Sequence, residues 1–270
     1  MSDRTQVLPR SVLITGASSG LGRALALAFA ARAQASSPSL RLCLTGRDAG
    51  RLAETALAAS AFGAELATAR LAISDEAAVR DWVLACDAVA PLDVVIANAG
   101  RSAGTGAGPE SADQVRILIE TNVLGVVNTV LPAAACMRTR GRGRIVILSS
   151  LAGRLPFPAT PTYSATKAFV RNWGLSMRPE LAQSGVGLTV VSPGYIATPM
   201  TAGNTFRMPF LVTADWAAAH ILRRLDGNPA EIGFPLGAVA AVNALSLLPR
   251  GLLGRLLLRG PHKHALTAEH

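Results

Sequence analysis

The chain has 270 residues, of which 50% are hydrophobic, and a net charge of +9. This composition excludes a disordered chain, and the length is sufficient for one large α/β domain with a buried core. The arginines are dispersed and lack interleaved aromatic residues, so we expect no nucleic-acid partner and assign the charge to a solvated surface that also attracts phosphorylated ligands.

Short runs rich in β-branched and aliphatic residues alternate with longer, alanine-rich amphipathic stretches. This alternation is typical of βαβ units around a parallel sheet that helices cover on both faces. In chain order we predict strand 11–15, helix 20–33, strand 40–45, helix 49–62, strand 64–72, helix 76–89, strand 92–97, helix 112–138, strand 144–149, helix 162–183, strand 186–192 and helix 213–226. The pattern predicts an α/β fold with a doubly wound parallel sheet, the Rossmann fold, as a single domain over residues 1–270.

The first strand runs into a glycine-rich turn that opens an alanine-rich helix. Gly16 permits the tight turn, Gly20 lets the backbone approach a pyrophosphate, and Gly22 allows close packing of helix on strand. Free N–H groups at the start of a helix bind phosphate. A plain structural turn is the alternative, but the place of the motif after the first strand favours a dinucleotide site.

The end of the second strand reads Leu-Thr-Gly-Arg-Asp over residues 44–48. Folds that select NAD carry an acidic residue here for the ribose hydroxyls, whereas Arg47 offers a planar fork suited to a 2′-phosphate. NADP(H) is therefore favoured over NAD(H). Two alternatives remain: Arg47 is one of many surface arginines, and Asp48 is a ribose ligand or the N-cap of the next helix.

Tyr163 and Lys167 lie four residues apart, which places them on one face of the predicted helix. The chain has only two tyrosines, so this spacing is an improbable coincidence for an ordinary exposed helix face. A phenol is a poor base until a nearby cation lowers its pKa, and we expect Lys167 to supply that cation.

With these motifs the chain resembles the short-chain dehydrogenase/reductase family, in its compact single-domain branch, through about Met200. The family's TGxxxGxG pattern matches residues 15–22, and its NAG element matches residues 98–100. Its catalytic tetrad matches Asn122, Ser150, Tyr163 and Lys167, and its element after the sixth strand matches Pro193, Gly194 and Thr198. The family often has Asp after the third strand where this chain has Ala72, so adenine would be held by the backbone of Ile73 or by packing.

The resemblance implies hydride transfer between a nicotinamide cofactor and a carbonyl or alcohol. Tyr163 would be the acid in reduction and the base in oxidation, and Ser150 would bond the substrate oxygen. Lys167 would grip the nicotinamide ribose, and Asn122 would anchor a water through its backbone. Ser150 could instead only bond backbone, and Asn122 could cap or interrupt its helix. The cofactor-binding residues expected are Gly16, Ser18, Ser19, Gly20, Leu21, Gly22, Arg47, Ile73, Asn98, Ala99, Gly100, Tyr163, Lys167, Pro193, Gly194, Ile196 and Thr198.

We expect the substrate pocket beyond the carboxyl ends of the strands, in residues 151–161 and a substrate loop at 195–215. These stretches hold Leu155, Phe157, Ile196, Met200, Phe206, Met208 and Phe210, which indicates an apolar substrate of moderate size. Residues 232–260 form an apolar and basic C-terminal segment. We expect it to contribute a strand and a helix that close the pocket or an oligomer interface, and a basic amphipathic helix touching lipid is the alternative.

The first residues lack the pattern of a signal peptide, and the three cysteines lie far apart, so we expect a cytoplasmic protein without a metal site. The resemblance implies a homodimer or homotetramer that pairs through helices 112–138 and 162–183. Rival functions are a non-catalytic NADP(H)-binding regulator, a membrane-surface lipid oxidoreductase, and a lyase or epimerase from a related branch.

Overall fold

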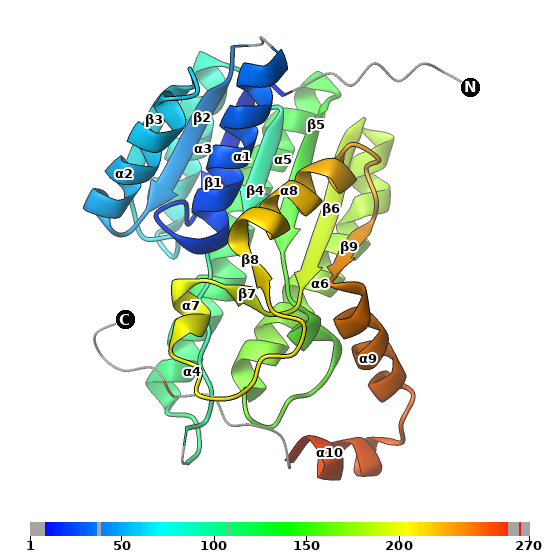
Figure 1. Ribbon diagram of the computed structural model, residues 1–270. Coiled ribbons are helices and arrows are strands. Elements are labelled where there is room, and N and C mark those ends of the chain that lie inside the picture. Colours follow the sequence, from blue (N-terminus) through cyan, green and yellow to red (C-terminus); the bar gives the residue numbers. More distant parts are fainter. Residues whose placement is uncertain (1–8, 37–38, 107, 259–264, 266–270) are drawn as a thin grey trace.

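A computed structural model describes residues 9–36, 39–106, 108–258 and 265. Its main sheet has seven parallel strands in the order β3-β2-β1-β4-β5-β6-β9, covered by helices on both faces (Figure 1). The strands are β1 (Ser11–Thr15), β2 (Arg41–Gly46), β3 (Glu65–Arg70), β4 (Val94–Ala97), β5 (Gly143–Leu148), β6 (Val186–Pro193) and β9 (Glu231–Phe234). The predicted doubly wound parallel sheet in a single domain is confirmed.

Within the described residues, three helices cover each face of the sheet. One face carries α1 (Gly20–Ser36), α2 (Ala49–Ser60) and α8 (Ala214–Leu225), and the other carries α3 (Glu76–Val89), α5 (Gly125–Arg140) and α6 (Pro161–Gln183). Beyond the carboxyl ends of the strands lie α4 (Ala112–Ile119), a 3₁₀ turn (Leu151–Arg154), β7 (Ile196–Ala197), α7 (Pro199–Ala202), β8 (Val212–Thr213), α9 (Leu236–Ser246) and α10 (Arg250–Leu258). This end of the sheet is where open α/β folds bind ligands.

Strand β1, which lies inside the sheet between β2 and β4, divides its side chains between two hydrophobic clusters. Val12 and Ile14 pack in the cluster under α1 and α8, whereas Leu13 packs in the cluster under α3 and α5. All three side chains are fully buried. Successive residues of a strand point to opposite faces, so a sheet covered on both sides needs an apolar residue at every position. This requirement explains the unbroken apolar run that marked the strand in the sequence.

The predicted helix 112–138 is not one α-helix. A π-helical turn, Glu120–Leu124, separates α4 from α5 and contains Asn122. The combined rod Ala112–Arg140 is long and apolar enough to cross a membrane, but α5 packs on α3, β4 and β5 as a core helix does. The other predicted boundaries shift by a few residues; for example, strand 64–72 is shorter and helix 20–33 is longer.

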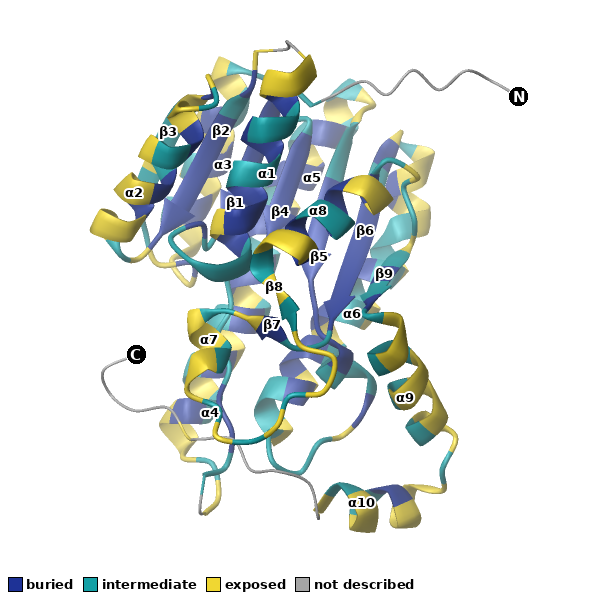
Figure 2. Cartoon of the chain, viewed as in Figure 1, coloured by how far each residue is buried: buried dark blue, intermediate teal, exposed yellow. Residues whose placement is uncertain are grey.

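The C-terminal segment 232–260 contributes β9 and α9, the strand and helix expected, and a second helix, α10. A cis peptide bond joins Phe234 to Pro235 between β9 and α9. Residues 259 and 260 of this predicted segment lie outside the described residues. Figure 2 shows that α9 and α10 are mostly exposed, in contrast to the buried inner strands β1, β4 and β6.

Candidate active site

The glycine-rich turn after β1 leaves no room for a side chain at Gly16 or Gly22. Gly16 adopts a left-handed conformation, with φ of +69°, which favours glycine. A Cβ atom added at Gly22 would stand 2.2 Å from the carbonyl oxygen of Gly16. The helix therefore begins in direct contact with the turn, and the backbone N–H groups at its first residues are available to an anion.

Asn98 supports this turn from the neighbouring strand β4. Its side-chain amide donates hydrogen bonds to the carbonyl oxygens of Thr15, at 2.9 Å, and Gly16, at 3.2 Å. The Thr15 hydroxyl in turn accepts from the backbone N–H groups of Asn98 and Ala99, both at 3.1 Å. The Asn98 amide thus holds the shape of the glycine-rich turn.

A cavity of about 740 Å³ runs from the turn across the carboxyl ends of the strands to α9 and α10. Every catalytic or cofactor residue predicted from the sequence lines this cavity except Asn122. Five of the seven apolar side chains expected in the substrate pocket also line it; Leu155 and Met208 do not. The volume falls within the range of cavities that enclose small molecules and cofactors.

Arg47 and Arg101 bring two positive charges to this cavity. Burial, and then the charge of Arg47, lower the pKa of the Arg101 guanidinium. The carboxylate of Asp48 is already engaged, since it caps α2 by accepting from the Arg51 backbone N–H at 3.0 Å and pairs with the Arg51 side chain at 2.6 Å. Of the two interpretations of Asp48, the geometry supports the N-cap.

Tyr163 and Lys167 lie one turn apart on α6, and the Lys167 amine is 6.0 Å from the centroid of the Tyr163 ring. Burial raises the pKa of the Tyr163 hydroxyl, while hydrogen bonds with Ser150 and Ser102 lower it, with burial dominant. The pKa of Tyr163 in the protein without cofactor is therefore raised, whereas a net lowering was expected. The reason is that burial disfavours the charged form of both side chains.

Lys167 is itself buried and donates a hydrogen bond to the carbonyl oxygen of Leu148 at 2.9 Å. Burial lowers its pKa from 10.5 to about 8. The amine lies close to the NAG segment, because a Cβ atom added at Gly100 would be 3.4 Å from it. Near neutral pH the amine is mostly protonated, so it places a positive charge beside Tyr163, in addition to the charges of Arg47 and Arg101 elsewhere in the cavity.

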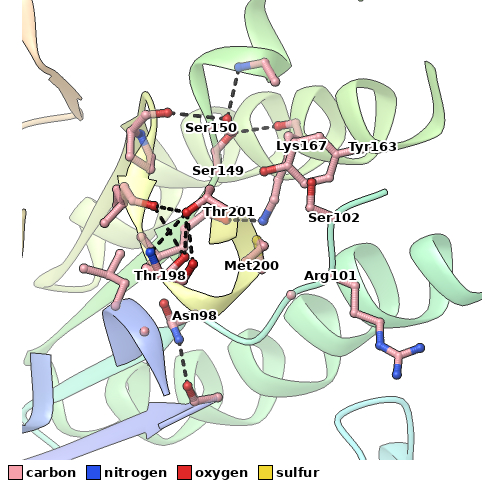
Figure 3. Close-up of a pocket in the computed structure, with 18 of the residues that line it drawn as sticks. Asn98, Arg101, Ser102, Ser149, Ser150, Tyr163, Lys167, Thr198, Met200 and Thr201 are labelled. Atoms are coloured by element: carbon pink, nitrogen blue, oxygen red, sulfur yellow. Dashed lines mark hydrogen bonds between the residues drawn. The ribbon is translucent and has the colours of Figure 1, made fainter. Parts of the chain in front are cut away.

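Ser150 faces Tyr163 from the end of β5 (Figure 3). Its hydroxyl accepts from the backbone N–H of Ala152 at 3.1 Å and lies 3.4 Å from the carbonyl oxygen of Pro193, to which it donates. The hydroxyl bonds backbone, as one interpretation of Ser150 has it, and it also bonds the Tyr163 hydroxyl. Its contact with a substrate oxygen stays a prediction. The backbone contacts fix its position beside the phenol.

Asn122 lies behind the cavity and is fully buried. Its carboxamide accepts from the Arg101 backbone N–H at 2.7 Å and donates to the Arg101 carbonyl oxygen at 2.9 Å. It also donates to the Thr166 hydroxyl at 3.2 Å. The side chain therefore ties the segment after β4 to α6, and it sits in the π-helical turn that interrupts its helix.

Two residues next to the NAG motif were not predicted as site residues. Ser102 contributes a second hydrogen bond to the Tyr163 hydroxyl, and Figure 3 shows the two side chains together. Arg101 points away from Tyr163 in the same view. The position of these two residues directly after the NAG element could have identified them. The Gly, Ser and Pro residues of this segment indicated only a loop. The contribution of α9 and α10 to the cavity wall was foreseen only as a general closing of the pocket.

These features fit a bound dinucleotide. A turn without side-chain room, a helix start that faces the cavity and the guanidinium of Arg47 suit the phosphates, while Tyr163, Ser150 and Lys167 stand at the far end. A sequence model described as short chain dehydrogenase matches residues 10–207. The chain belongs to the short-chain dehydrogenase family. It is an NAD(P)-dependent oxidoreductase that acts on CH–OH or C=O groups.

Relatives of this short-chain dehydrogenase agree with that membership. An uncharacterized oxidoreductase of Myxococcus xanthus is 35% identical over 244 residues, which cover 90% of this chain and 94% of that protein. The structure of a short-chain dehydrogenase from Sphingobium yanoikuyae in complex with NADPH is 26% identical, with a TM-score of 0.77, and covers 96% of this chain and 99% of that one. A short-chain dehydrogenase from Mycobacterium paratuberculosis bound to NAD shares the fold, at 24% identity and a TM-score of 0.72, over 86% of this chain and 98% of that one.

Proposed function

We propose that this short-chain dehydrogenase transfers hydride between NADP(H) and an apolar carbonyl or alcohol of moderate size, with Tyr163 as the acid and base. The observation that carries the proposal is the convergence of Tyr163, Ser150 and Lys167 in one cavity that also contains Arg47. Arg47 follows β2, three strands from β5, which carries Ser150 at its end. One cofactor bound in this cavity could therefore contact Arg47 with its phosphates and lie beside Tyr163 with its nicotinamide.

In reduction, the carbonyl carbon receives a hydride, which the nicotinamide supplies when bound, and the carbonyl oxygen receives the proton of the Tyr163 hydroxyl. The C=O π bond becomes a C–O–H group, and the two electrons would come from the bound nicotinamide, which would leave oxidised. Burial keeps Tyr163 protonated before the transfer, since its pKa is raised. Ser150 and Ser102 then stabilise the phenolate through the hydrogen bonds that lower this pKa.

Lys167 and Asn122 complete the proposed site. The Lys167 ammonium would hold the nicotinamide ribose and stabilise negative charge on Tyr163 from one helical turn away. Asn122 would anchor, through its backbone in the π-helical turn, a water that links Lys167 to solvent and restores the Tyr163 proton. No metal is needed, because Tyr163 and Ser150 supply the proton and the oxygen contact.

The preference for NADP(H) rests on Arg47. A guanidinium can bond a 2′-phosphate through two parallel N–H groups, whereas the nearby carboxylate of Asp48 is held by α2 and Arg51. The NADPH complex of the Sphingobium yanoikuyae enzyme supports the proposal. The NAD complex of the Mycobacterium paratuberculosis enzyme shows that the fold itself does not decide the cofactor.

The test is oxidation of NADPH and NADH with a panel of aldehydes, ketones and quinones. Tyr163→Phe should reduce turnover about 10²- to 10⁴-fold without loss of NADPH binding. Arg47→Ala should weaken NADPH binding about 10- to 100-fold and leave NADH binding unchanged, because a hydrogen bond to a charged group contributes about 1.5 to 3 kcal/mol. Arg80→Ala, at an exposed arginine of α3, is the matched control. Full turnover by Tyr163→Phe would refute the acid–base role, and NADPH binding without turnover of any substrate would favour the regulatory alternative.

We also propose a homodimer or homotetramer that pairs through the long helices, now α4 with α5 and α6. Leu131 and Phe169 are exposed on these helices, and Phe169 stacks on Trp173 with ring centroids 6.3 Å apart. Light scattering that gives a monomer at working concentration would refute this assembly.

A cytoplasmic location is proposed because all three cysteines are free of disulfides.

A further inference from the structure

The last two helices of the described chain expose large apolar side chains. Helix α9 has no buried residue, and Leu236 at its start and Leu247 after its end are 82% and 85% exposed. Helix α10 exposes Leu252 and Leu256, one turn apart on one face. Figure 1 shows both helices extending beyond the sheet, away from the helices that cover its faces. Large apolar side chains gathered on the exposed ends and faces of two adjoining helices are a feature of interaction surfaces.

The same segment is basic and lacks acidic residues. Arg250 and Arg255 are exposed on α10. The sequence contains no Asp or Glu between Glu231 and Glu269. We call Leu236, Leu247, Leu252, Leu256, Arg250 and Arg255 the C-terminal surface. An occupant of this surface must therefore offer apolar contact and negative charge together.

An anionic bilayer offers both. Lipid phosphates attract arginines near the membrane surface, and the acyl chains accept the leucines. A second copy of the chain offers leucines for apolar contact, but a symmetric pair would set the same arginines against each other with no local carboxylate to pair with. The charge pattern selects the lipid surface.

The inner sides of these helices form part of the cavity wall. Ala238, Val242 and Leu245 of α9 and Leu257 of α10 line the cavity that contains Tyr163. The loop before β8 joins this wall, because a Cβ atom added at Gly237 would stand 2.6 Å from the ring of Phe210. The apolar exterior of α9 and α10 thus adjoins the apolar interior of the site.

We propose that the C-terminal surface docks on an anionic membrane and that the substrate is a long-chain lipid carbonyl or alcohol that enters along the wall of α9 and α10. The substrate half of this inference rests on the proposed function, whereas the docking half does not. The redox step is that of the proposed function, with hydride to the carbonyl carbon and the Tyr163 proton to the oxygen. Docking lets an apolar substrate pass from bilayer to cavity without crossing water.

Co-sedimentation with vesicles tests the docking. The full chain should bind vesicles of phosphatidylcholine mixed with phosphatidylglycerol and should not bind phosphatidylcholine alone. The double variant Leu252→Asp with Leu256→Asp should weaken binding about 100-fold or more, and Arg250→Ala with Arg255→Ala about 30-fold. Leu57→Asp, at an exposed leucine of α2, is the matched control and should bind as the wild type does. No binding to anionic vesicles, or an equal loss with Leu57→Asp, overturns the docking.

Turnover with NADPH separates docking from chemistry. The leucine double variant should reduce water-soluble butanal at the wild-type rate and lose about tenfold or more of its rate with hexadecanal carried in anionic vesicles. Butanal reduction without hexadecanal reduction by the wild type overturns the lipid substrate and leaves the proposed function intact. Vesicle binding by a wild type that reduces neither aldehyde overturns the lipid substrate and supports docking alone. Light scattering that shows self-association lost in the leucine double variant, with no vesicle binding, assigns the surface to a second copy.

Discussion

Glu231, the first residue of β9, joins three elements around the site. It accepts hydrogen bonds from Arg171 of α6 at 2.9 and 2.7 Å and from Ser192 of β6 at 2.6 Å. It also pairs at 2.8 Å with Arg154, which in turn donates to Asn243 of α9 at 2.9 Å. The carboxylate is only 16% exposed, so solvent screens these contacts weakly. We predict that Glu231→Gln lowers the free energy of unfolding by about 3 kcal/mol at neutral pH.

The magnitude follows from the pKa of this carboxyl. Burial raises the pKa of Glu231, but the hydrogen bonds from Arg171, Ser192 and Arg154 outweigh burial and lower it from 4.5 to about 2. A pKa lowered by folding means that the ionised group stabilises the folded state above the unfolded pKa, and that this stabilisation is lost as the pH falls toward the folded pKa. About 1.4 kcal/mol of it should be lost by about pH 3.5.

Urea unfolding of wild type and Glu231→Gln at several pH values measures this contribution. The difference in unfolding free energy should stay near 3 kcal/mol from about pH 8 to about pH 5 and shrink below that. Asp113→Asn removes an exposed ion pair with Arg116 and should change stability by less than about 0.5 kcal/mol at every pH. A Glu231→Gln variant as stable as the wild type, or a deficit that does not shrink between about pH 5 and about pH 3.5, would refute this role of the Glu231 carboxylate.

Three further changes probe the site. Gly22→Ala places a Cβ atom 2.2 Å from the Gly16 oxygen, so NADPH binding measured by titration should weaken at least about tenfold. The circular dichroism spectrum should stay that of a folded protein, and unchanged binding would contradict the close approach. The NADPH dissociation constant of the wild type should rise as the pH increases through about 8, where Lys167 loses its proton. Lys167→Met should make the dissociation constant independent of pH in this range, and a pH dependence kept in Lys167→Met would point to another group. Asn122→Ala leaves the backbone N–H and C=O of Arg101 without their partner and should lower unfolding stability by about 2 to 3 kcal/mol, against which an unchanged urea midpoint would count.

The sheet was predictable from the sequence because burial on both faces imposes a visible pattern. Val12, Leu13 and Ile14 must all be apolar, since they serve two clusters at once. The glycine-rich turn was predictable for a related reason: Gly16 and Gly22 stand where any side chain would collide. In both places one local rule of geometry dictates the residue type.

The sequence did not reveal features that depend on contacts between distant segments. The π-helical turn at Asn122 carries no local signal, and the Asn122 side chain in it bonds residues 21 and 44 positions away. Strands β7 and β8 have two residues each and exist only by pairing with each other. The four-residue spacing of Tyr163 and Lys167 was correct, but the direction of the tyrosine pKa depends on burial, which spacing does not encode.

The order of parts along the chain has an evolutionary consequence. Every residue proposed for proton transfer or cofactor contact precedes α7, whereas the walls contributed by α9 and α10 come last, after the family match ends at residue 207. One wall of the cavity is therefore encoded in a stretch of the gene that holds no proposed catalytic residue, while Phe157 and Ile196 line the cavity from the earlier stretch. Exchange of the last stretch between relatives would alter that wall and keep every proposed catalytic residue.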